Sequence, residues 1–388
     1  MRDFKLHIPT KFIFGIDAID KIGKETRKIA ENILIVCSDG SVKTTGLLDR
    51  VKNTLKNSGV NVLVYDKVKP NPTVSIIDAG AKFIEGKKID AIIGIGGGSA
   101  IDTAKGIGIA SANGKSIWNF VHINKTTKKS IPIIAVPTIS AAGSEGNSYG
   151  VVTNDETNEK VSFICYDARP KISIIDPKLT LTVPKDYLID GAIDIIIHSI
   201  EAYFTTKDFA PLNDRISLSL VKTVVEILPE ILKNLADLEL RKILSWSAVM
   251  ALNDINDSGR EGAYPMHALE HPLSGHFGIS HGRGLAMIFP RYLEYFSELK
   301  SEKIINFGKF VFDNSIETTG EVIVKLKKWL EENNRNLIFD DLDIPKSAIK
   351  IFSKDIIKIN GNRFGRISGP REMTEEDIEN IYKKCLTK

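Results

Sequence analysis

The sequence predicts an α/β domain built on a parallel sheet, followed by an all-helical domain. Three observations support this division. The chain has 388 residues, more than one hydrophobic core usually organises, so two domains are expected. Its first half alternates short apolar runs with amphipathic stretches. After Thr182-Val183-Pro184 the strand-like runs almost vanish. We therefore place the domains at residues 1–183 and 184–388.

In the first domain, runs rich in isoleucine and valine predict buried strands. These runs are 32–37, 61–65, 90–95, 131–136 and 172–175. Helical patterns lie between them, for example at 47–56 and 74–85. Strands that alternate with helices form a parallel sheet covered on both faces, and such sheets bind ligands at the carboxyl ends of their strands.

The second domain is predicted to be helical because its apolar residues recur with a period of about 3.6. The expected helices are 190–206, 212–235, 238–256, 262–272, 282–298, 301–312, 319–334 and 374–386.

Composition excludes several classes of protein. The net charge of +3 is small, and no basic cluster is interleaved with aromatic residues, which argues against a nucleic-acid partner. No run of apolar residues is long enough to span a membrane. The three cysteines are isolated in the sequence, and the N-terminus lacks an apolar signal core. These features predict a cytoplasmic protein.

A glycine-rich loop is predicted to bind phosphate. Gly96-Gly97-Gly98 lies between a predicted strand and a predicted helix. Glycines let backbone N–H groups approach an anion, and the helix N-terminus adds partial positive charge. The spacing is not the Gly-x-Gly-x-x-Gly fingerprint of dinucleotide-binding folds, and a tight structural turn is the alternative. Three consecutive glycines in this context favour a pyrophosphate.

Two further loops follow predicted strands. The loop 137–145 offers small residues and hydroxyls, among them Thr138 and Ser140, that could donate to a phosphate or carboxamide; a plain loop is the alternative. Asp39 follows another strand, where its carboxylate could accept hydrogen bonds from both ribose hydroxyls and would repel a 2′-phosphate. An Asp-Gly turn is the simpler local interpretation of that position.

Four of the seven histidines lie in the fifteen residues from His267 to His281. Spacing of i, i+4 puts Asp194 and His198 on one helix face, and His267 and His271 on another. We expect Pro272 and Gly275 to end the second helix. Imidazoles with one carboxylate suit a divalent transition metal. Four ligands would come from the set Asp194, His198, His267, His271 and His281. We expect His276 to face solvent or to help shape the pocket.

Together these motifs resemble the iron-containing (group III) alcohol dehydrogenases. The matching motifs are Gly-Gly-Gly-Ser-x-x-Asp-x-x-Lys at 96–105, Pro-Thr…Gly-Ser-Glu at 137–145, Asp-x-x-x-His-x-x-Glu at 194–201 and His-x-x-x-His-Pro-Leu…His-Gly at 267–282. The resemblance runs from about residue 7 to 386. It implies a Rossmann-like nucleotide-binding domain and a helical domain in a dehydroquinate synthase-like architecture. The implied reaction is metal-dependent hydride transfer between a nicotinamide cofactor and a small primary alcohol, aldehyde or diol.

The resemblance also implies roles for individual residues. The metal ligands fall on Asp194, His198, His267 and His281, with Fe²⁺ as the metal and Zn²⁺ as the alternative. His271 is placed near the nicotinamide and substrate, as a candidate proton relay rather than a ligand. Cofactor contacts fall on Asp39, Gly97, Gly98, Ser99, Asp102, Thr138 and Lys160, to which loop chemistry adds Ser140. A homodimer is the implied assembly.

Departures from the family pattern affect the cofactor site. This chain has Ile139, Ser140 and Ala142 where members usually carry other loop residues. Asp39 favours NAD over NADP, although Gly40-Ser41 matches the NADP-type pattern.

Two rival functions come from other classes. A sugar-phosphate cyclase of the dehydroquinate synthase type would need basic side chains around the metal, whereas Ala, Leu, Pro and Phe flank it here. A non-catalytic nucleotide-binding protein is the second rival.

Overall fold

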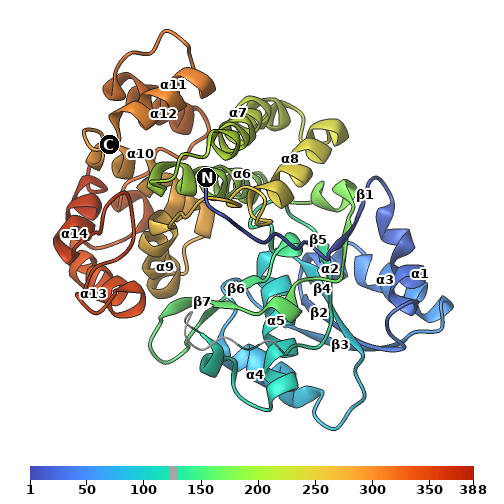
Figure 1. Cartoon of the computed structure of the whole chain (residues 1–388). Helices are drawn as coiled ribbons and strands as arrows, with labels where there is room; N and C mark the ends of the chain where they lie inside the picture. The colour runs from blue at the N-terminus through green and yellow to red at the C-terminus, as the bar shows by residue number, and fades with distance from the viewer. Residues whose placement is uncertain (122–126, 128) are drawn as a thin grey trace. The chain divides into compact units, whose positions relative to one another are not determined.

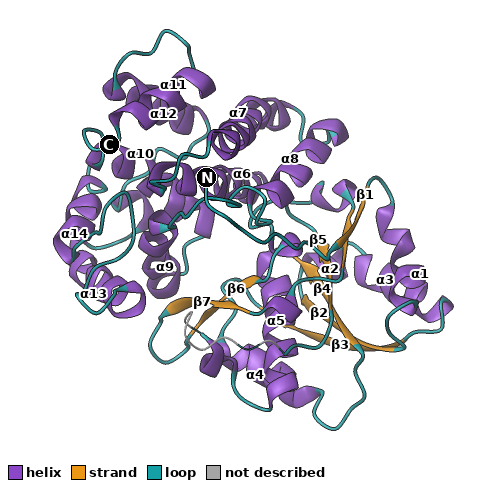
Figure 2. Cartoon of the chain, in the orientation of Figure 1, coloured by secondary structure: helices purple, strands orange, loops and turns teal. Residues whose placement is uncertain are grey.

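The computed structural model describes residues 1–121, 127 and 129–388, and the chain forms two compact units. We call His7–Pro184 with Leu235–Val249 the sheet unit. Met1–Leu6, Lys185–Asn234 and Met250–Lys388 form the helical unit. Figures 1 and 2 show the strands in the first unit and the helical composition of the second. The predicted fold class is confirmed.

The sheet unit contains, in the described residues, a parallel sheet in the order β1-β8-β5-β4-β2-β3. Its strands are β1 (Lys11–Phe14), β2 (Asn32–Ser38), β3 (Asn61–Val68), β4 (Ala91–Gly96), β5 (Ile133–Pro137) and β8 (Ile172–Ile175), while β6 (Tyr149–Thr153) and β7 (Lys160–Ile164) form a separate antiparallel pair. The five expected strands are present. The sequence analysis missed β1, which has four residues, and the β6–β7 pair, whose apolar runs are interrupted by Gly150 and Ser162.

Helices cover both faces of this sheet. On one face α1 (Ile22–Arg27) and α3 (Leu47–Asn57) share a core with β2, in which Val51 and Leu55 join Ile33 and Ile35. On the other face α5 (Gly98–Asn113) approaches β4 so closely that a Cβ atom at Gly94 would lie 3.0 Å from the Cα of Ile101. On the first face α2 (Ser41–Thr44) adds Val42 to the same core, and on the second face α4 (Val74–Phe83) packs against α5.

The strand order reverses between β2 and β4, because β3 pairs with one side of β2 and β4 with the other. The register sets Cys37 beside Ile95, and Gly96 beside Pro137. The loops after β2, β4 and β5 therefore leave the same edge of the sheet, at the reversal point where open α/β sheets bind ligands.

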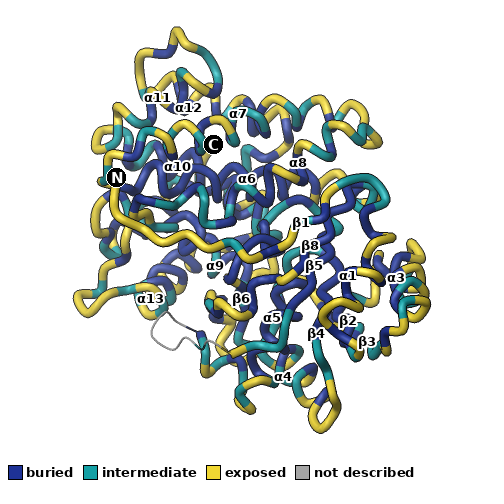
Figure 3. The backbone as a smooth tube through the Cα atoms, turned by 45° about the vertical axis from the view of Figure 1, so that its right-hand side comes forward, coloured by how far each residue is buried: buried dark blue, intermediate teal, exposed yellow. Residues whose placement is uncertain are grey.

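The helical unit is built around α6 (Lys185–Thr205), which is buried along nearly its whole length (Figure 3). The other helices are α7 (Pro211–Lys233), α9 (Pro265–Phe277), α10 (His281–Tyr295), α11 (Ser301–Val311), α12 (Thr319–Glu332), α13 (Ile349–Asn360) and α14 (Glu375–Lys384). The sequence analysis missed α13. A helix that is apolar all round belongs in a core, so polar groups on α6 are held in the interior. Across the described residues, every helix is too short or too polar to cross a bilayer.

One expected helix end is wrong. Helix α9 continues through Pro272 to Phe277, and Gly278 ends it with φ 66° while its N–H bonds the Ser274 carbonyl. Proline lacks the N–H that would bond the carbonyl four residues earlier, but packing within the unit holds the helix across this position. The left-handed conformation at Gly278 is the usual glycine stop.

The expected boundary at residue 183 lies one residue from the main division, but two segments join the other unit. The amino group of Met1 donates to the Phe209 carbonyl at 2.8 Å, and Arg2 pairs with Asp208 at 2.7 Å, so the N-terminus belongs to the helical unit. Most of α8 (Leu238–Ala251) belongs to the sheet unit, where Trp246 packs edge-on against Phe12 and Phe14. These contacts join segments far apart in the sequence, which local patterns do not reveal.

Candidate active site

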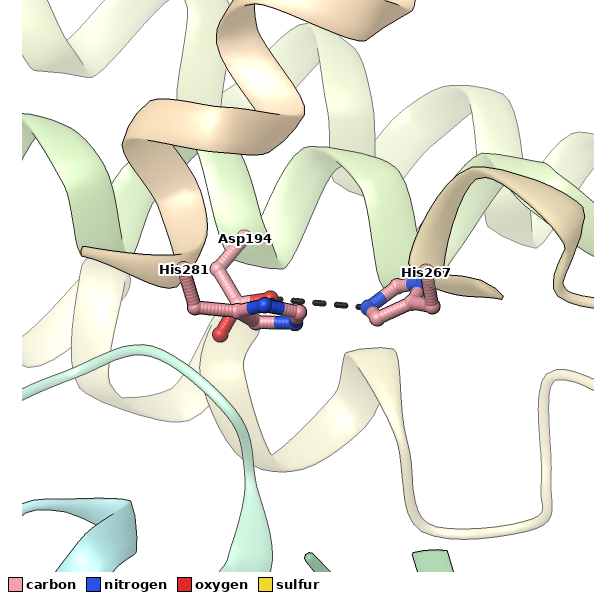
Figure 4. Close-up of side chains that lie close together, drawn as sticks. All are labelled: Asp194, His267 and His281. Carbon is pink, nitrogen blue, oxygen red and sulfur yellow. Dashed lines mark ion pairs between the residues drawn. The ribbon is translucent and has the colours of Figure 1, made fainter. Parts of the chain in front are cut away.

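Three side chains of the helical unit converge on one point (Figure 4). Asp194 comes from α6, His267 from α9 and His281 from the first residue of α10. A set of ligand atoms, one from each, lies within 4.8 Å of one another. The Nε2 atoms of His267 and His281 lie 3.6 and 3.8 Å from Asp194 Oδ1. These distances are longer than hydrogen bonds and suit three ligands around one ion.

Two atoms of this group, Asp194 Oδ1 and His267 Nε2, are buried and lack a well-formed hydrogen bond among the described residues. His198 Nδ1 lies 3.1 Å from Asp194 Oδ1, but it also lies 3.0 Å from the Asp194 carbonyl oxygen, so one N–H is shared between two acceptors. Incompletely paired buried polar atoms are costly, so their convergence needs an explanation. A divalent cation supplies one, because carboxylate and imidazole are ligands that Zn²⁺ and Fe²⁺ accept.

The charges of the group are strongly coupled. Burial alone would raise the pKa of Asp194, but the facing imidazoles of His198, His267 and His281 hold it well below its usual range. Burial would likewise lower the pKa of His267, but Glu201 and Asp194 raise it to about 10. Asp194 is therefore ionised and ready to bind a cation.

The other predicted histidines occupy different positions. His198 is buried, its Nδ1 lies 3.0 Å from the Asp194 carbonyl oxygen, and its ring centre lies 4.2 Å from that of His267. The ring centre of His271 is 5.9 Å from that of His281. His276 points elsewhere: its Nε2 lies 2.7 Å from an Asp355 oxygen of α13, within hydrogen-bond distance.

Two carboxylates, to which the sequence analysis gave no role although its motif at 194–201 ends at Glu201, contact the histidines from outside. Glu201 accepts a hydrogen bond from Nδ1 of His267, and Glu270 accepts one from Nδ1 of His281. Both glutamates are fully buried. The signal for Glu201 was its spacing, since residue 201 follows Asp194 by two helical turns on the same face. For Glu270 the only clue in the sequence was its position directly before His271, a candidate ligand.

In the sheet unit, the glycine loop packs tightly against the second loop. A Cβ atom at Gly97 would lie 2.9 Å from Ile139 Cγ2, and one at Gly98 would lie 3.3 Å from Ala142 Cβ. The unusual residues Ile139 and Ala142 thus fill space that these glycines leave. Close packing is one reason for glycine at these two positions. Anion binding at the N-terminus of α5, which begins at Gly98, is a second reason compatible with this geometry.

Several predicted cofactor residues are engaged inside this unit. Asp102 accepts hydrogen bonds from Ser144 at 2.6 Å and from the Val151 N–H at 3.0 Å, and burial raises its pKa. The Ser140 and Ser245 hydroxyls lie 2.9 Å apart. Lys160 is buried on β7, whereas Ser99 and Thr138 are partly exposed on the loops.

Asp39 lies on the loop after β2, and its side chain is 71% exposed. The Lys43 ammonium pairs with both Asp39 and Asp66. The Lys43 bond contributes most to lowering the pKa of Asp66, to about 2. The adenosine end of a nucleotide at this edge would therefore meet a carboxylate and an ammonium together.

Comparison with known proteins identifies the family to which both halves of the chain belong. The family model for "Iron-containing alcohol dehydrogenase" matches residues 9–177, and the model for the C-terminal part of that family matches residues 188–386. The chain belongs to the iron-containing alcohol dehydrogenase family. The resemblance drawn from the motifs is confirmed.

Curated relatives cover the chain from end to end. NADH-dependent butanol dehydrogenase A of Clostridium acetobutylicum is 31% identical over 99% of this chain and 100% of its own length. NADPH-dependent aldehyde reductase YqhD of Escherichia coli is 30% identical over 99% of both chains. The family thus includes enzymes named for either nicotinamide cofactor.

Solved structures agree with the architecture. The crystal structure of NADH-dependent butanol dehydrogenase A from Thermotoga maritima superposes with a TM-score of 0.95, at 31% identity, and covers 100% of this chain and 99% of that one. A 1,3-propanediol oxidoreductase gives 0.88 at 25% identity, covering 99% and 100%.

Proposed function

We propose that this protein is an NAD(P)-dependent oxidoreductase that interconverts small primary alcohols or diols with their aldehydes, using one divalent metal ion. The observation that carries the proposal is the convergence of the buried side chains of Asp194 and His267 with His281: the Nε2 atoms of the two histidines lie 3.6 and 3.8 Å from Asp194 Oδ1. The names of the relatives support the substrate class: butanol dehydrogenase, aldehyde reductase and 1,3-propanediol oxidoreductase.

The helical unit would hold the metal, and the sheet unit the nucleotide. Asp194, His198, His267 and His281 are the proposed ligands, with Fe²⁺ as the ion and Zn²⁺ as a competitor that such sites bind more tightly. When bound, the metal would polarise the oxygen of the alcohol or aldehyde, and the nicotinamide would accept or give the hydride. His271 is the proposed relay for the hydroxyl proton; in support, it is half-buried and its ring centre lies 5.9 Å from that of His281.

The loops after β2, β4 and β5 would bind the cofactor. Gly97, Gly98 and Ser99 would hold the pyrophosphate at the N-terminus of α5. The proposed contacts of the remaining residues are Thr138 and Ser140 on the second loop, Lys160 on β7, and Asp39 at the ribose. Both oxygens of Asp102 accept hydrogen bonds within the unit. Asp102 would therefore support the cofactor site indirectly, by fixing Ser144 and β6, rather than by direct contact with the cofactor.

His267→Ala tests the metal centre. The variant should bind less than one equivalent of metal and lose more than about 100-fold in activity, beyond what the loss of an outer partner of a ligand costs. It should keep nucleotide affinity, because its site lies in the other unit. Metal analysis of anaerobically purified protein, cofactor fluorescence titration and a panel of alcohols and aldehydes measure these. Full activity without metal would refute the scheme.

His271→Ala serves as the matched histidine variant. Slower turnover with metal still bound is expected. Metal loss in this variant would show that the ligand set is assigned wrongly.

We further propose that NAD is preferred to NADP. The exposed Asp39 carboxylate can accept hydrogen bonds from the ribose hydroxyls and repels a 2′-phosphate. Lys43 has the opposite effect, because its ammonium would attract that phosphate once Asp39 no longer pairs with it.

Asp39→Gly should therefore raise the ratio of kcat/KM for NADP⁺ to that for NAD⁺ by about tenfold, the equivalent of roughly 1.4 kcal/mol. The double variant Asp39→Gly/Lys43→Met should lose most of that gain. Steady-state rates with both cofactors measure the ratio. An unchanged ratio in the single variant would show that Asp39 does not read the ribose.

The rivals predict other results in the same assays. A sugar-phosphate cyclase would show no net cofactor reduction with butanol, and a non-catalytic protein would bind cofactor without turnover on any alcohol. A cytoplasmic homodimer is the proposed state, and sedimentation velocity tests the assembly.

A further inference from the structure

We propose that Glu201 and Glu270 are positioning residues that fix the ring orientation and the Nδ1–H tautomer of two proposed metal-binding histidines from outside the ligand group. The inference rests on the proposed function, because it assigns a role toward the same ion. It concerns two buried carboxylates that the reaction scheme does not use.

The two glutamates make the same kind of contact from different helices. Glu201 of α6 accepts a hydrogen bond from Nδ1 of His267, and Glu270 of α9 accepts one from Nδ1 of His281. A carboxylate only accepts, so Nδ1 of each ring carries a proton. In the neutral ring that a metal ion requires, the lone pair is then on Nε2, on the side of Asp194, from which these atoms lie 3.6 and 3.8 Å.

His198 follows the same rule with a different acceptor. Its Nδ1 lies 3.0 Å from the Asp194 carbonyl oxygen, which also can only accept. All three imidazoles are thus held with the proton on Nδ1. Metal-binding histidines are usually fixed in this way, by a carboxylate or carbonyl on the other nitrogen.

The surroundings of the glutamates leave them little freedom. Both are fully buried, and α10 passes Glu270 at a glycine: a Cβ atom at Gly284 would lie 2.8 Å from Glu270 Cγ. The second oxygen of Glu201 accepts the backbone N–H of Met266, while the second oxygen of Glu270 accepts the hydroxyl of Ser274. Each carboxylate is therefore fixed at both oxygens.

The second partners, Met266 and Ser274, differ in whether they can accept a hydrogen bond. This difference predicts which glutamate tolerates replacement by glutamine better. Met266 N–H can only donate, so a glutamine at 201 would turn its one oxygen toward either Met266 or His267. Turning it to Met266 points the amide NH₂ at His267, which favours the wrong tautomer, with the proton on Nε2. Ser274 can instead accept, because its hydroxyl also lies 3.0 Å from the Ile279 carbonyl and can donate there. A glutamine at 270 can therefore keep its oxygen toward His281.

The test compares Glu201→Gln and Glu270→Gln, with the exposed Glu230→Gln of α7 as the matched control. The probe is Co²⁺, added to metal-free protein and titrated against a competing chelator, with the visible spectrum of the bound ion as a second readout. Glu201→Gln should weaken Co²⁺ binding about 10- to 100-fold, the range that outer partners of ligands usually contribute. Its spectrum should also shift. Glu270→Gln should lose less than Glu201→Gln, and the control should match the parent.

The outcomes separate this role from the metal site itself. Parental affinity and spectrum in both glutamine variants would overturn the positioning role while leaving the site intact. A parent that binds no Co²⁺ would overturn both the site and the role. Should Glu201→Gln fail to fold, Glu270→Gln and Glu270→Ala decide: the alanine variant must bind Co²⁺ more weakly than the glutamine variant, and equal affinities would overturn the role.

Discussion

At the scale of single residues, burial rather than sequence position decides how ionisable groups behave. Asp39 and Glu145 both follow strands of the same sheet, yet Asp39 is exposed and paired with Lys43, whereas Glu145 is only 4% exposed. Burial raises the pKa of Glu145 to about 7, from an ordinary value of 4.5. A carboxyl group held in this way stabilises the fold when protonated and opposes it when ionised.

Glu145→Gln should therefore become more favourable as pH rises. The folded state binds this proton more tightly than the unfolded state, so the parent loses stability between about pH 4.5 and 7, by about 3 kcal/mol at most. The Tm of Glu145→Gln minus that of the parent should be larger at pH 8 than at pH 4.5. The exposed Glu156→Gln, in the same unit, should show no such change. A constant difference for Glu145→Gln would contradict the buried-acid explanation.

At the scale of elements, a buried lysine joins α5 to the loop that follows β5. The Lys105 ammonium donates to Ser144 Oγ at 2.8 Å, to Asn147 Oδ1 at 3.1 Å and to the Tyr149 carbonyl at 2.5 Å. Its side chain is fully buried, and Ser144 also bonds Asp102 on α5. One charged group thus holds the helix that begins at the glycine loop against the start of β6.

Lys105→Met should remove one charged hydrogen bond from each of those three acceptors while roughly keeping the volume of the side chain. We expect a loss of about 3 kcal/mol in stability and weaker nucleotide binding, because the second loop is no longer fixed. Thermal unfolding and cofactor titration measure these two effects. Lys56→Met, on the exposed face of α3, is the control and should be close to neutral. Normal nucleotide affinity in a destabilised Lys105→Met protein would limit the lysine to a structural role.

At the scale of the whole molecule, the proposed metal and the proposed nucleotide would bind different units. The candidate metal ligands come from α6, α9 and α10 of the helical unit, and the phosphate loops come from the sheet unit. A ligand that binds only the folded form stabilises it by RT ln(1 + [L]/Kd), about 2.7 kcal/mol at one hundred times Kd. Each ligand should therefore stabilise mainly the unit that binds it.

Hydrogen exchange measured by mass spectrometry can show which unit each ligand stabilises. Adding Zn²⁺ to metal-free protein should slow exchange in peptides from α6, α9 and α10. Adding NAD⁺ should slow exchange in peptides around the β2–α2 and β4–α5 loops. The opposite pattern would contradict the assignment of the two sites to their units, and the N-terminal half of α12 serves as an internal reference.

The sequence alone determined the class of each half, and it supplied the candidate residues of the site. Isoleucine-rich runs and 3.6-residue periodicity are local properties, so five of the strands and most helices could be read directly. Imidazoles and a carboxylate at helical spacing indicated a metal, and three of the proposed ligands, Asp194, His267 and His281, converge as that pattern requires.

Only the tertiary structure decided what surrounds those residues. The Glu201–His267 contact, the Asp355 partner of His276 and the use of Ile139 and Ala142 to fill space beside glycines all join segments far apart in the chain. The Glu270–His281 contact spans only eleven residues, but it depends on how α9 and α10 pack. The passage of α9 through Pro272 depends in the same way on packing that outweighs a local helix breaker. Periodicity records which side of an element is apolar, but which neighbour meets that side is set by how the elements pack.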